Sequence, residues 1–376
     1  MMALSILWFI LVAVLWIVYL VLEGFDFGVG MLMPLVAKND RERSAVIRTV
    51  GPHWDGNEVW LLTAGGATFA AFPAWYATMF SGMYLALFLV LVLLILRISA
   101  FEWRAKLNSE KWRHVWDWFL IISSYLTPLV LGVAFANLVQ GMHIVVQNRL
   151  TLEQIAVANV PEAISSGLAV FNLTGGFWSL FSIFTVVGGI MVLLICFTQG
   201  ALFLSMKASG VIADRVNGLV GKVSLITTVL AAIWVIWGQL AYSSNVWSWI
   251  PLVVAALGLI AATAFSQKAL RKEGLSFICS SIGIAAAVSW IFVSMAPNVM
   301  KSSVDPAYSL TIELASSTQG TLLIMSIVAC VMVPIVLLYT IWSYWVFRKR
   351  VSTQDVEEEP GLLLKKIRLG ANFLAG

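Results

Sequence analysis

ALSILWFILVAVLWIVYLVL, residues 3–22, is the stretch of sequence that decides the fold. It contains no charged side chain, and about 20 apolar residues are enough for a helix to cross the hydrocarbon core of a membrane. No basic residue precedes the stretch and no small-residue cleavage site follows it, because the chain continues into Glu23-Gly24-Phe25-Asp26. We therefore interpret it as a retained first transmembrane helix and not as a signal peptide.

Further apolar segments follow along the whole chain. Of all residues 60% are hydrophobic and only 11% are charged, whereas soluble domains typically carry about 25% charged residues. A chain with so little charge cannot cover a globule with polar surface, so the sequence predicts an all-α polytopic transmembrane bundle of about nine helices. The predicted spans are residues 3–37, 50–71, 74–100, 118–141, 178–206, 222–243, 248–267, 275–297 and 321–347.

The basic residues are distributed unequally between the two sides of this nine-span arrangement. Of the 23 Lys and Arg residues, 21 fall on one side, and only Arg149 and Lys301 fall on the other. Cytoplasmic loops carry the excess of Lys and Arg, so the N-terminus is predicted outside and the C-terminus inside. We expect one transmembrane domain over residues 1–350 and a cytoplasmic tail over residues 351–376. Basic clusters in short loops also argue against a nucleic-acid partner.

Four carboxyl side chains lie inside the predicted spans, namely Glu23, Asp26, Asp55 and Glu58. An ionisable group in hydrocarbon costs roughly 2.5–3.5 kcal/mol, so it is rarely without a function. Each helix carries its two acids at positions i and i+3, on one face, and Asp26 and Asp55 both lie roughly 16–18 Å from the inner turn. Burial and mutual repulsion favour the protonated form of a carboxyl group, which suits groups that take up and release protons.

Two interpretations of these acids remain open. They could form a proton route or a substrate cavity, or they could only lock the first two helices together by pairing with Arg, Trp N–H or Asn. The first helix also carries Gly24 and Gly28 in a GxxxG pair, which predicts the close approach of a neighbouring helix.

Histidine is scarce, with only His53, His114 and His143 in the chain, and the last two fall in predicted loops. A haem with two axial histidines needs a second buried imidazole, and no HExxH, P-loop or nucleotide-binding motif is present either. The sequence therefore predicts no metal site in this chain. His53 is interpreted as a hydrogen-bonding partner, with a His–Met haem ligand pair as the alternative.

Two motifs carry a resemblance to a known family. EGFDFGVG, residues 23–30, and GPHWDGNEVW, residues 51–60, resemble the signatures of subunit II of cytochrome bd-type quinol oxidases. Shorter matches such as TQGA, residues 198–201, and VPIVLLYT, residues 333–340, extend the resemblance over essentially residues 1–350.

The resemblance implies a function and its partners. Such oxidases oxidise membrane quinol and reduce dioxygen to water, taking protons from the cytoplasm without pumping them. Two haems b and one haem d are carried by subunit I, and some relatives hold a structural quinone in subunit II. The implied partners are the haem-bearing subunit I, membrane lipid and, as a further candidate, a small single-span subunit. The implied location is a bacterial or archaeal cytoplasmic membrane.

The resemblance also implies roles for single residues. Asp55 is the leading proton-path residue, with Asp26, Glu58 and Glu23 as neighbours at similar depth. His53, Trp54 and Asn57 are expected to orient these acids by hydrogen bonds, and Trp60 matches a position near the proposed dioxygen access. The chain departs from the family at Ile312-Glu313-Leu314 and over residues 142–177, so cofactor-binding residues remain unassigned.

Two rival functions remain. A proton-coupled secondary transporter could use the same carboxyl groups, but transporters often show inverted repeats with paired broken helices, and here the four acids have no counterpart in the second half. A purely structural assembly subunit would use the acids for packing alone.

Overall fold

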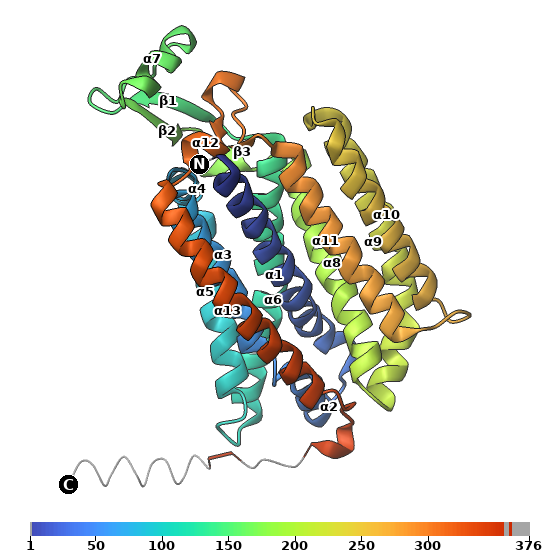
Figure 1. Cartoon of the computed structure of the whole chain (residues 1–376). Helices are drawn as coiled ribbons and strands as arrows, with labels where there is room; N and C mark the ends of the chain where they lie inside the picture. Colours follow the sequence, from blue (N-terminus) through green and yellow to red (C-terminus); the bar gives the residue numbers. More distant parts are fainter. Residues whose placement is uncertain (1, 357–360, 363–376) are drawn as a thin grey trace, which may run out of the picture.

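The computed structural model describes residues 2–356 and 361–362, and Figure 1 shows a bundle of long helices that run side by side. Within the described chain, eight helices are long and apolar enough to cross a membrane. The predicted all-α polytopic bundle is therefore confirmed. The eight helices are α1 (Met2–Val36), α5 (Tyr84–Trp103), α6 (Glu110–Gln140), α8 (Ile183–Lys207), α9 (Val211–Tyr242), α10 (Trp249–Ser266), α11 (Glu273–Met295) and α13 (Gln319–Val346).

A further helix, α3 (Trp54–Ala71), runs between the same two ends of the bundle (Figure 1). Its 18 residues extend about 27 Å at 1.5 Å per residue, close to the thickness of a hydrocarbon core. It carries two acids, Asp55 and Glu58, near its start. We interpret α3 as the ninth crossing, which corresponds to the predicted span 50–71.

Two boundaries differ from the prediction. The connection between the first two predicted spans, expected to form only a turn, contains a separate helix, α2 (Asp40–Val50), whose N-cap Asn39 accepts a hydrogen bond from the backbone N–H of Glu42. The predicted single span 74–100 is divided into α4 (Pro73–Gly82) and α5, which begins directly after Met83. Neither division changes the hydropathy of the sequence, so a prediction from hydropathy cannot locate these helix ends.

The end of the bundle that is predicted to face outside carries two small antiparallel sheets that the sequence did not predict; we call it the outer end and the opposite end the inner end. Strand β1 (Ile144–Asn148) pairs with β2 (Ala169–Leu173), and β3 (Asn298–Met300) pairs with β4 (Leu310–Thr311). Met142 bonds through its backbone to Lys301 and Ser303 and so joins the two sheet regions. The short helices of the described chain are η1 (Val157–Asn159), α7 (Val160–Ser165), η2 (Phe177–Leu180), η3 (Val246–Ser248), η4 (Pro306–Tyr308), α12 (Ile312–Ala315) and η5 (Thr353–Asp355).

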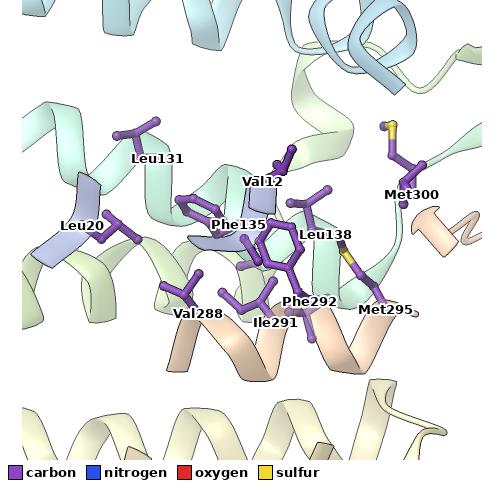
Figure 2. Packing of buried hydrophobic residues seen from close by; sticks show 14 of the residues in the cluster. Val12, Leu20, Leu131, Phe135, Leu138, Val288, Ile291, Phe292, Met295 and Met300 are labelled. Carbon is purple, nitrogen blue, oxygen red and sulfur yellow. The ribbon is translucent and has the colours of Figure 1, made fainter. Parts of the chain in front are cut away.

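The first helix lies at the centre of the bundle, packed against α3, α6, α8 and α11. An added Cβ at Gly28 would lie 2.1 Å from the carbonyl oxygen of Cys196 and 2.7 Å from Cα of Gly200 in α8. The close helix approach predicted from the GxxxG pair is therefore confirmed at Gly28. Figure 2 shows the apolar cluster towards the outer half, where Phe135 and Phe292 pack beside α1.

The last long helix, α13, packs sparsely on the rest of the chain. Only Leu322 of its residues is buried, while most of its other apolar side chains are exposed. At its outer end, the Trp8 indole N–H donates to the Leu322 carbonyl oxygen (3.2 Å) and to Ser326 Oγ (3.0 Å). At its inner end, Tyr344 reaches α3. The helix is thus attached mainly near its two ends.

Candidate functional site

Three helices bring three acids and one arginine together inside the bundle. Glu23 and Asp26 of α1 are fully buried, Glu58 of α3 is half-buried, and Arg97 of α5 is fully buried between them. Arg97 Nη1 donates to Glu23 Oε1 and lies 3.6 Å from Glu58 Oε2. The guanidinium group also lies over the ring of Phe27, 4.5 Å from its centroid. We call Glu23, Asp26, Glu58 and Arg97 the carboxyl cluster.

The charges of the carboxyl cluster do not balance. It holds three carboxyl groups and one guanidinium, so an all-ionised cluster would carry excess negative charge in a buried place. Glu23 Oε2, Asp26 Oδ1 and Glu58 Oε2 are buried and have no hydrogen-bond partner among the described residues. A buried carboxyl oxygen without a donor disfavours the ionised form of its group. The cluster is therefore built to hold a proton.

A second set of contacts connects Asp26 to the last helix. Asn57 Nδ2 donates to Asp26 Oδ2 (2.7 Å), and the Tyr344 hydroxyl donates to Asn57 Oδ1 (2.9 Å). The ring of Tyr344 stacks on His53, with 4.1 Å between the ring centroids and an interplanar angle of 3°. Ser343 Oγ lies 3.5 Å from His53 Nδ1. Asn57 thus bonds Asp26 directly, whereas His53 contacts Tyr344 and Ser343 and bonds to no acid of the described chain.

Asp55 lies about one turn before Glu58 on α3, displaced towards the exposed face of the helix. Its side chain is exposed, whereas Glu58 faces Arg97. Asn57, the partner of Asp26, is two residues from Asp55, or about 3 Å along the helix axis. Asp55 therefore lies at nearly the predicted depth, but the described chain does not place it in the carboxyl cluster.

The two tryptophans expected at the site are both buried. Trp54 stacks on Phe101 of α5, with ring centroids 5.0 Å apart and planes 16° from parallel. Trp60 lies in the apolar core two residues beyond Glu58. Neither indole group donates to an acid of the carboxyl cluster in any hydrogen bond found among the described residues, so the predicted orienting role of Trp54 is not what its geometry provides.

Sequence reasoning missed two residues of the site. Arg97 was counted only among the basic residues of the inner side, although it ends the apolar run LVLVLLILR, residues 89–97, where a lone arginine is itself a signal of a buried acid partner. Tyr344 gave no such signal, because tyrosine near a helix end is typical of the membrane interface.

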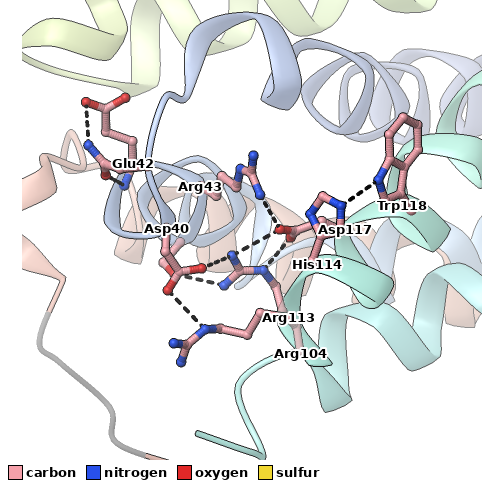
Figure 3. Close-up of polar contacts among 10 residues, drawn as sticks. Asp40, Glu42, Arg43, Arg104, Arg113, His114, Asp117 and Trp118 are labelled. Carbon is pink, nitrogen blue, oxygen red and sulfur yellow. Dashed lines mark hydrogen bonds and ion pairs between the residues drawn. The ribbon is translucent and has the colours of Figure 1, made fainter. Parts of the chain in front are cut away.

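The inner end of the bundle is held by a separate ion-pair network (Figure 3). Asp117 of α6 accepts from Arg104 Nε (2.6 Å) and from Arg43 Nη1 (2.9 Å) of α2. Asp40 of α2 pairs with Arg104 and with Arg113. These contacts fix α2 to the inner ends of α5 and α6 and so fix the start of α3.

Glu42 of α2 forms its own pair with Arg215 of α9. The Arg215 guanidinium and the Lys38 backbone N–H donate to the Glu42 carboxylate, and these hydrogen bonds lower its pKa below the ordinary value of a glutamate. The pair joins the short inner helix to the far side of the bundle.

The structure also contains an apolar cavity of about 120 Å³ between α8, α9, α10 and α11. Its lining includes Met191, Ile195, Trp234 and Ile284. In the described part of the chain, no group of three or more His, Cys, Asp or Glu side chains could hold a metal ion.

The comparisons with known proteins agree with one another. The family model of cytochrome bd terminal oxidase subunit II matches residues 4–347. The chain is 40% identical over 355 residues to cytochrome bd ubiquinol oxidase subunit 2 of Bacillus subtilis, covering 93% of this chain and 97% of that protein. It is 37% identical over 382 residues to cytochrome bd-I ubiquinol oxidase subunit 2 of Escherichia coli K12, covering 93% and 96%.

A solved structure shares the fold. A chain of the bd oxidase from Geobacillus thermodenitrificans superposes with a TM-score of 0.61 at 11% identity, covering 91% of this chain and 98% of that one. Because the family model spans nearly the whole bundle and both relatives exceed one third identity over most of their length, this chain belongs to the family of cytochrome bd terminal oxidase subunit II.

Proposed function

We propose that this chain supplies the oxidase with a cytoplasmic proton-uptake path through the carboxyl cluster, and with the surface on which subunit I assembles. As a member of its family, the chain is a multi-pass plasma-membrane subunit of a quinol:oxygen oxidoreductase. Reduction of dioxygen to water consumes protons, so such an enzyme needs a route that brings them into the membrane. The observation that carries the proposal is the gathering of three carboxyl groups around a single guanidinium, with a buried oxygen of each carboxyl group left without a hydrogen-bond donor.

Asp55 is the natural entrance to this path. It is exposed at nearly the depth of Asp26, and Glu58 lies three residues further along the same helix, half-buried and directed at Arg97. The Asp55 carboxylate would accept a proton from water and pass it to Glu58, which regenerates the Asp55 carboxylate. From Glu58 the proton reaches the pair Glu23 and Asp26. The basic-residue asymmetry places the uptake side in the cytoplasm.

The exposed face of α3 supports the assembly role. Asp55 shares this face with Val59 and Leu62, which are 50% and 73% exposed, and an added Cβ at Gly56 or Gly66 would meet no atom within 4 Å. A carboxylate facing lipid at mid-membrane depth would be costly. We infer that the partner subunit I covers this face and supplies polar surroundings for Asp55.

We place the haems, of types b and d, on subunit I. Among the histidines of the described chain, His53 alone is buried, and it caps the membrane-crossing helix α3. Its ring is stacked on Tyr344. This geometry suits a packed hydrogen-bonding residue and does not suit an axial ligand. The cavity between α8 and α11 suits the apolar tail of a structural quinone, and we place lipid and any small single-span subunit on the exposed faces of α9 and α10.

The rival functions find less support. A proton-coupled transporter needs a substrate cavity with polar groups, and the largest cavity found in the described chain is lined almost wholly by apolar side chains. A purely structural role would leave the acids matched by cations, whereas three carboxyl groups share one arginine here.

Two variants test the uptake path in the assembled oxidase. Asp26→Asn and Asp55→Asn keep the shape of the side chain but cannot carry a proton. We expect normal haem spectra and subunit ratios with strongly slowed quinol-driven oxygen consumption. Glu313→Gln, at an exposed outer position, is the matched control and should respire normally. Wild-type rates in both Asp variants would show that the acids serve packing alone.

A further inference from the structure

The hydroxyl group of Tyr344 is the first member of a hydrogen-bonded row that ends at Asp26. The row joins three helices that are far apart in sequence, with Tyr344 on α13, Asn57 on α3 and Asp26 on α1. An asparagine amide presents an acceptor oxygen on one side and a donor NH₂ group on the other, and a tyrosine hydroxyl can both donate and accept. The orientation of Asn57 therefore depends on both of its neighbours.

In the observed arrangement all donors point towards Asp26. The Tyr344 hydroxyl donates to Asn57 Oδ1, and Asn57 Nδ2 donates to Asp26 Oδ2, which suits an ionised Asp26. If Asp26 takes up a proton, the amide can turn over, so that Asp26 donates to Oδ1 and Nδ2 donates to the Tyr344 hydroxyl oxygen. Both arrangements keep the hydrogen bonds that join Tyr344 to Asn57 and Asn57 to Asp26, and a buried polar group is costly when it loses such a bond.

We propose that Tyr344 is a positioning residue for proton uptake. Its hydroxyl keeps the Asn57 side chain hydrogen-bonded to Asp26 whether Asp26 is ionised or protonated. This inference rests on the proposed function of the carboxyl cluster and deepens it. Tyr344 is not itself part of the route, since the amide of Asn57 holds no readily transferable proton. Its role is to let Asp26 gain and lose a proton without losing its hydrogen bond.

The surroundings of Tyr344 are built to hold its ring in place. One face stacks on His53, and Phe25 of α1 meets the ring edge-on, with centroids 6.4 Å apart. Beyond the helix, the segment 347–356 is fixed to the inner side of the bundle. Val351 pairs through its backbone with Lys207 and Ser209, and Arg48 donates to the Asp355 carbonyl oxygen.

This fixation matters because α13 is attached to the chain mainly near its two ends. A helix that packs so little along its length would not by itself place one hydroxyl at 2.9 Å from an amide oxygen. The segment 347–356 and the stack on His53 supply that placement. Three charged or titratable groups lie near Asp26, namely Glu23 on its own helix, Glu58 and Arg97. None of them is hydrogen-bonded to Asn57 in the described chain.

The test uses the assembled oxidase and removes one hydroxyl group. Tyr344→Phe keeps the ring that stacks on His53, and Tyr84→Phe, at an exposed tyrosine of α5, is the matched control. We expect Tyr344→Phe to keep the haem spectrum and subunit ratio but to lower turnover about tenfold, the upper end of what a neutral hydrogen bond commonly contributes. Tyr84→Phe should retain wild-type turnover.

A double-mutant cycle shows whether Tyr344 acts through Asn57. If it does, Tyr344→Phe lowers turnover in the wild-type background but causes no further loss in Asn57→Ala. Infrared difference spectra supply a readout that mere packing would not change. The carboxyl C=O band that disappears in Asp26→Asn should be shifted in Tyr344→Phe. If the double variant shows the product of the two single losses of turnover, or if the carboxyl band is unshifted in Tyr344→Phe, the inference is overturned.

A reciprocal measurement keeps the inference testable if Tyr344→Phe assembles poorly. In Asp26→Asn, the C–O band of Tyr344, identified with isotope-labelled tyrosine, should move relative to wild type, and an unmoved band would refute the coupling. The two proposals fail separately. Wild-type turnover in Asp26→Asn contradicts proton uptake through the cluster, whereas slow Asp26→Asn together with wild-type Tyr344→Phe contradicts only the positioning role.

Discussion

Replacing Arg97 by methionine should unbalance the carboxyl cluster more than any other single change. Methionine keeps most of the apolar stem of Arg97 and removes the only guanidinium that Glu23 and Glu58 share. The side chains of Arg97 and Glu23 are both 0% exposed, so water cannot replace the lost partner. Breaking a buried ion pair from one side commonly costs about 3–5 kcal/mol.

The structure also predicts which second change restores stability. Glu23→Gln removes the acid that bonds directly to Arg97. The double variant with Glu23→Gln and Arg97→Met keeps two acids of the cluster, namely Asp26, which accepts from Asn57, and Glu58, whose side chain is 12% exposed. Replacing both members of a buried pair by neutral groups is often nearly neutral in stability. The double variant should therefore recover most of the loss.

The assay is thermal unfolding of the purified oxidase in one detergent, followed by loss of the haem absorbance. A loss of 3–5 kcal/mol corresponds to a fall in Tm of roughly 5–10 °C for a chain of this size. Arg48→Met, at the inner surface, controls for the general effect of removing an arginine. An Arg97→Met oxidase that melts within 1 °C of wild type, or a double variant less stable than Arg97→Met, would refute the reasoning.

Two further predictions follow from other contacts. Gly28→Ala should destabilise the bundle by about 1–3 kcal/mol, because the new Cβ meets the backbone of α8 at Gly200, whereas Gly218→Ala meets open space and should be tolerated; thermal unfolding measures both. Burial lowers the pKa of Lys301 to about 8, so the unfolded chain binds the extra proton between about pH 8 and 10.5 and stability should rise over this window. The Tm of wild type minus that of Lys301→Met, measured against pH, should show that rise, and a flat difference would contradict it.

Much of the fold follows from simple patterns in the sequence. Runs of about 20 apolar residues predicted the long helices, because the bilayer sets their length. Gly28 correctly indicated a close helix contact, since only a missing Cβ lets two backbones approach so nearly. The division at Met83 and the separate helix α2 were missed, because turns within apolar or charged stretches leave no mark in hydropathy.

The site was only partly predictable, for reasons of geometry. Charge in an apolar run identified Glu23, Asp26 and Glu58, but which face of α3 is buried depends on neighbours that no local pattern describes. Asp55 therefore lay on an exposed face. Arg97 was within reach of sequence reasoning and was passed over as a loop residue. Tyr344 was not within reach, because it meets Asn57 across 287 residues of chain.

That separation has a consequence for how the protein is made. Ribosomes add about 5–20 residues per second, so roughly 15–60 s pass between the synthesis of Asn57 and that of Tyr344. For this time α1 and α3 already lie in the membrane with their acids, while the last helix is still missing. The polar row is completed only when the final span inserts. A nascent subunit cut short before α13 would thus carry an unfinished acidic surface, a feature by which quality-control proteases that survey the membrane could distinguish truncated chains from finished ones.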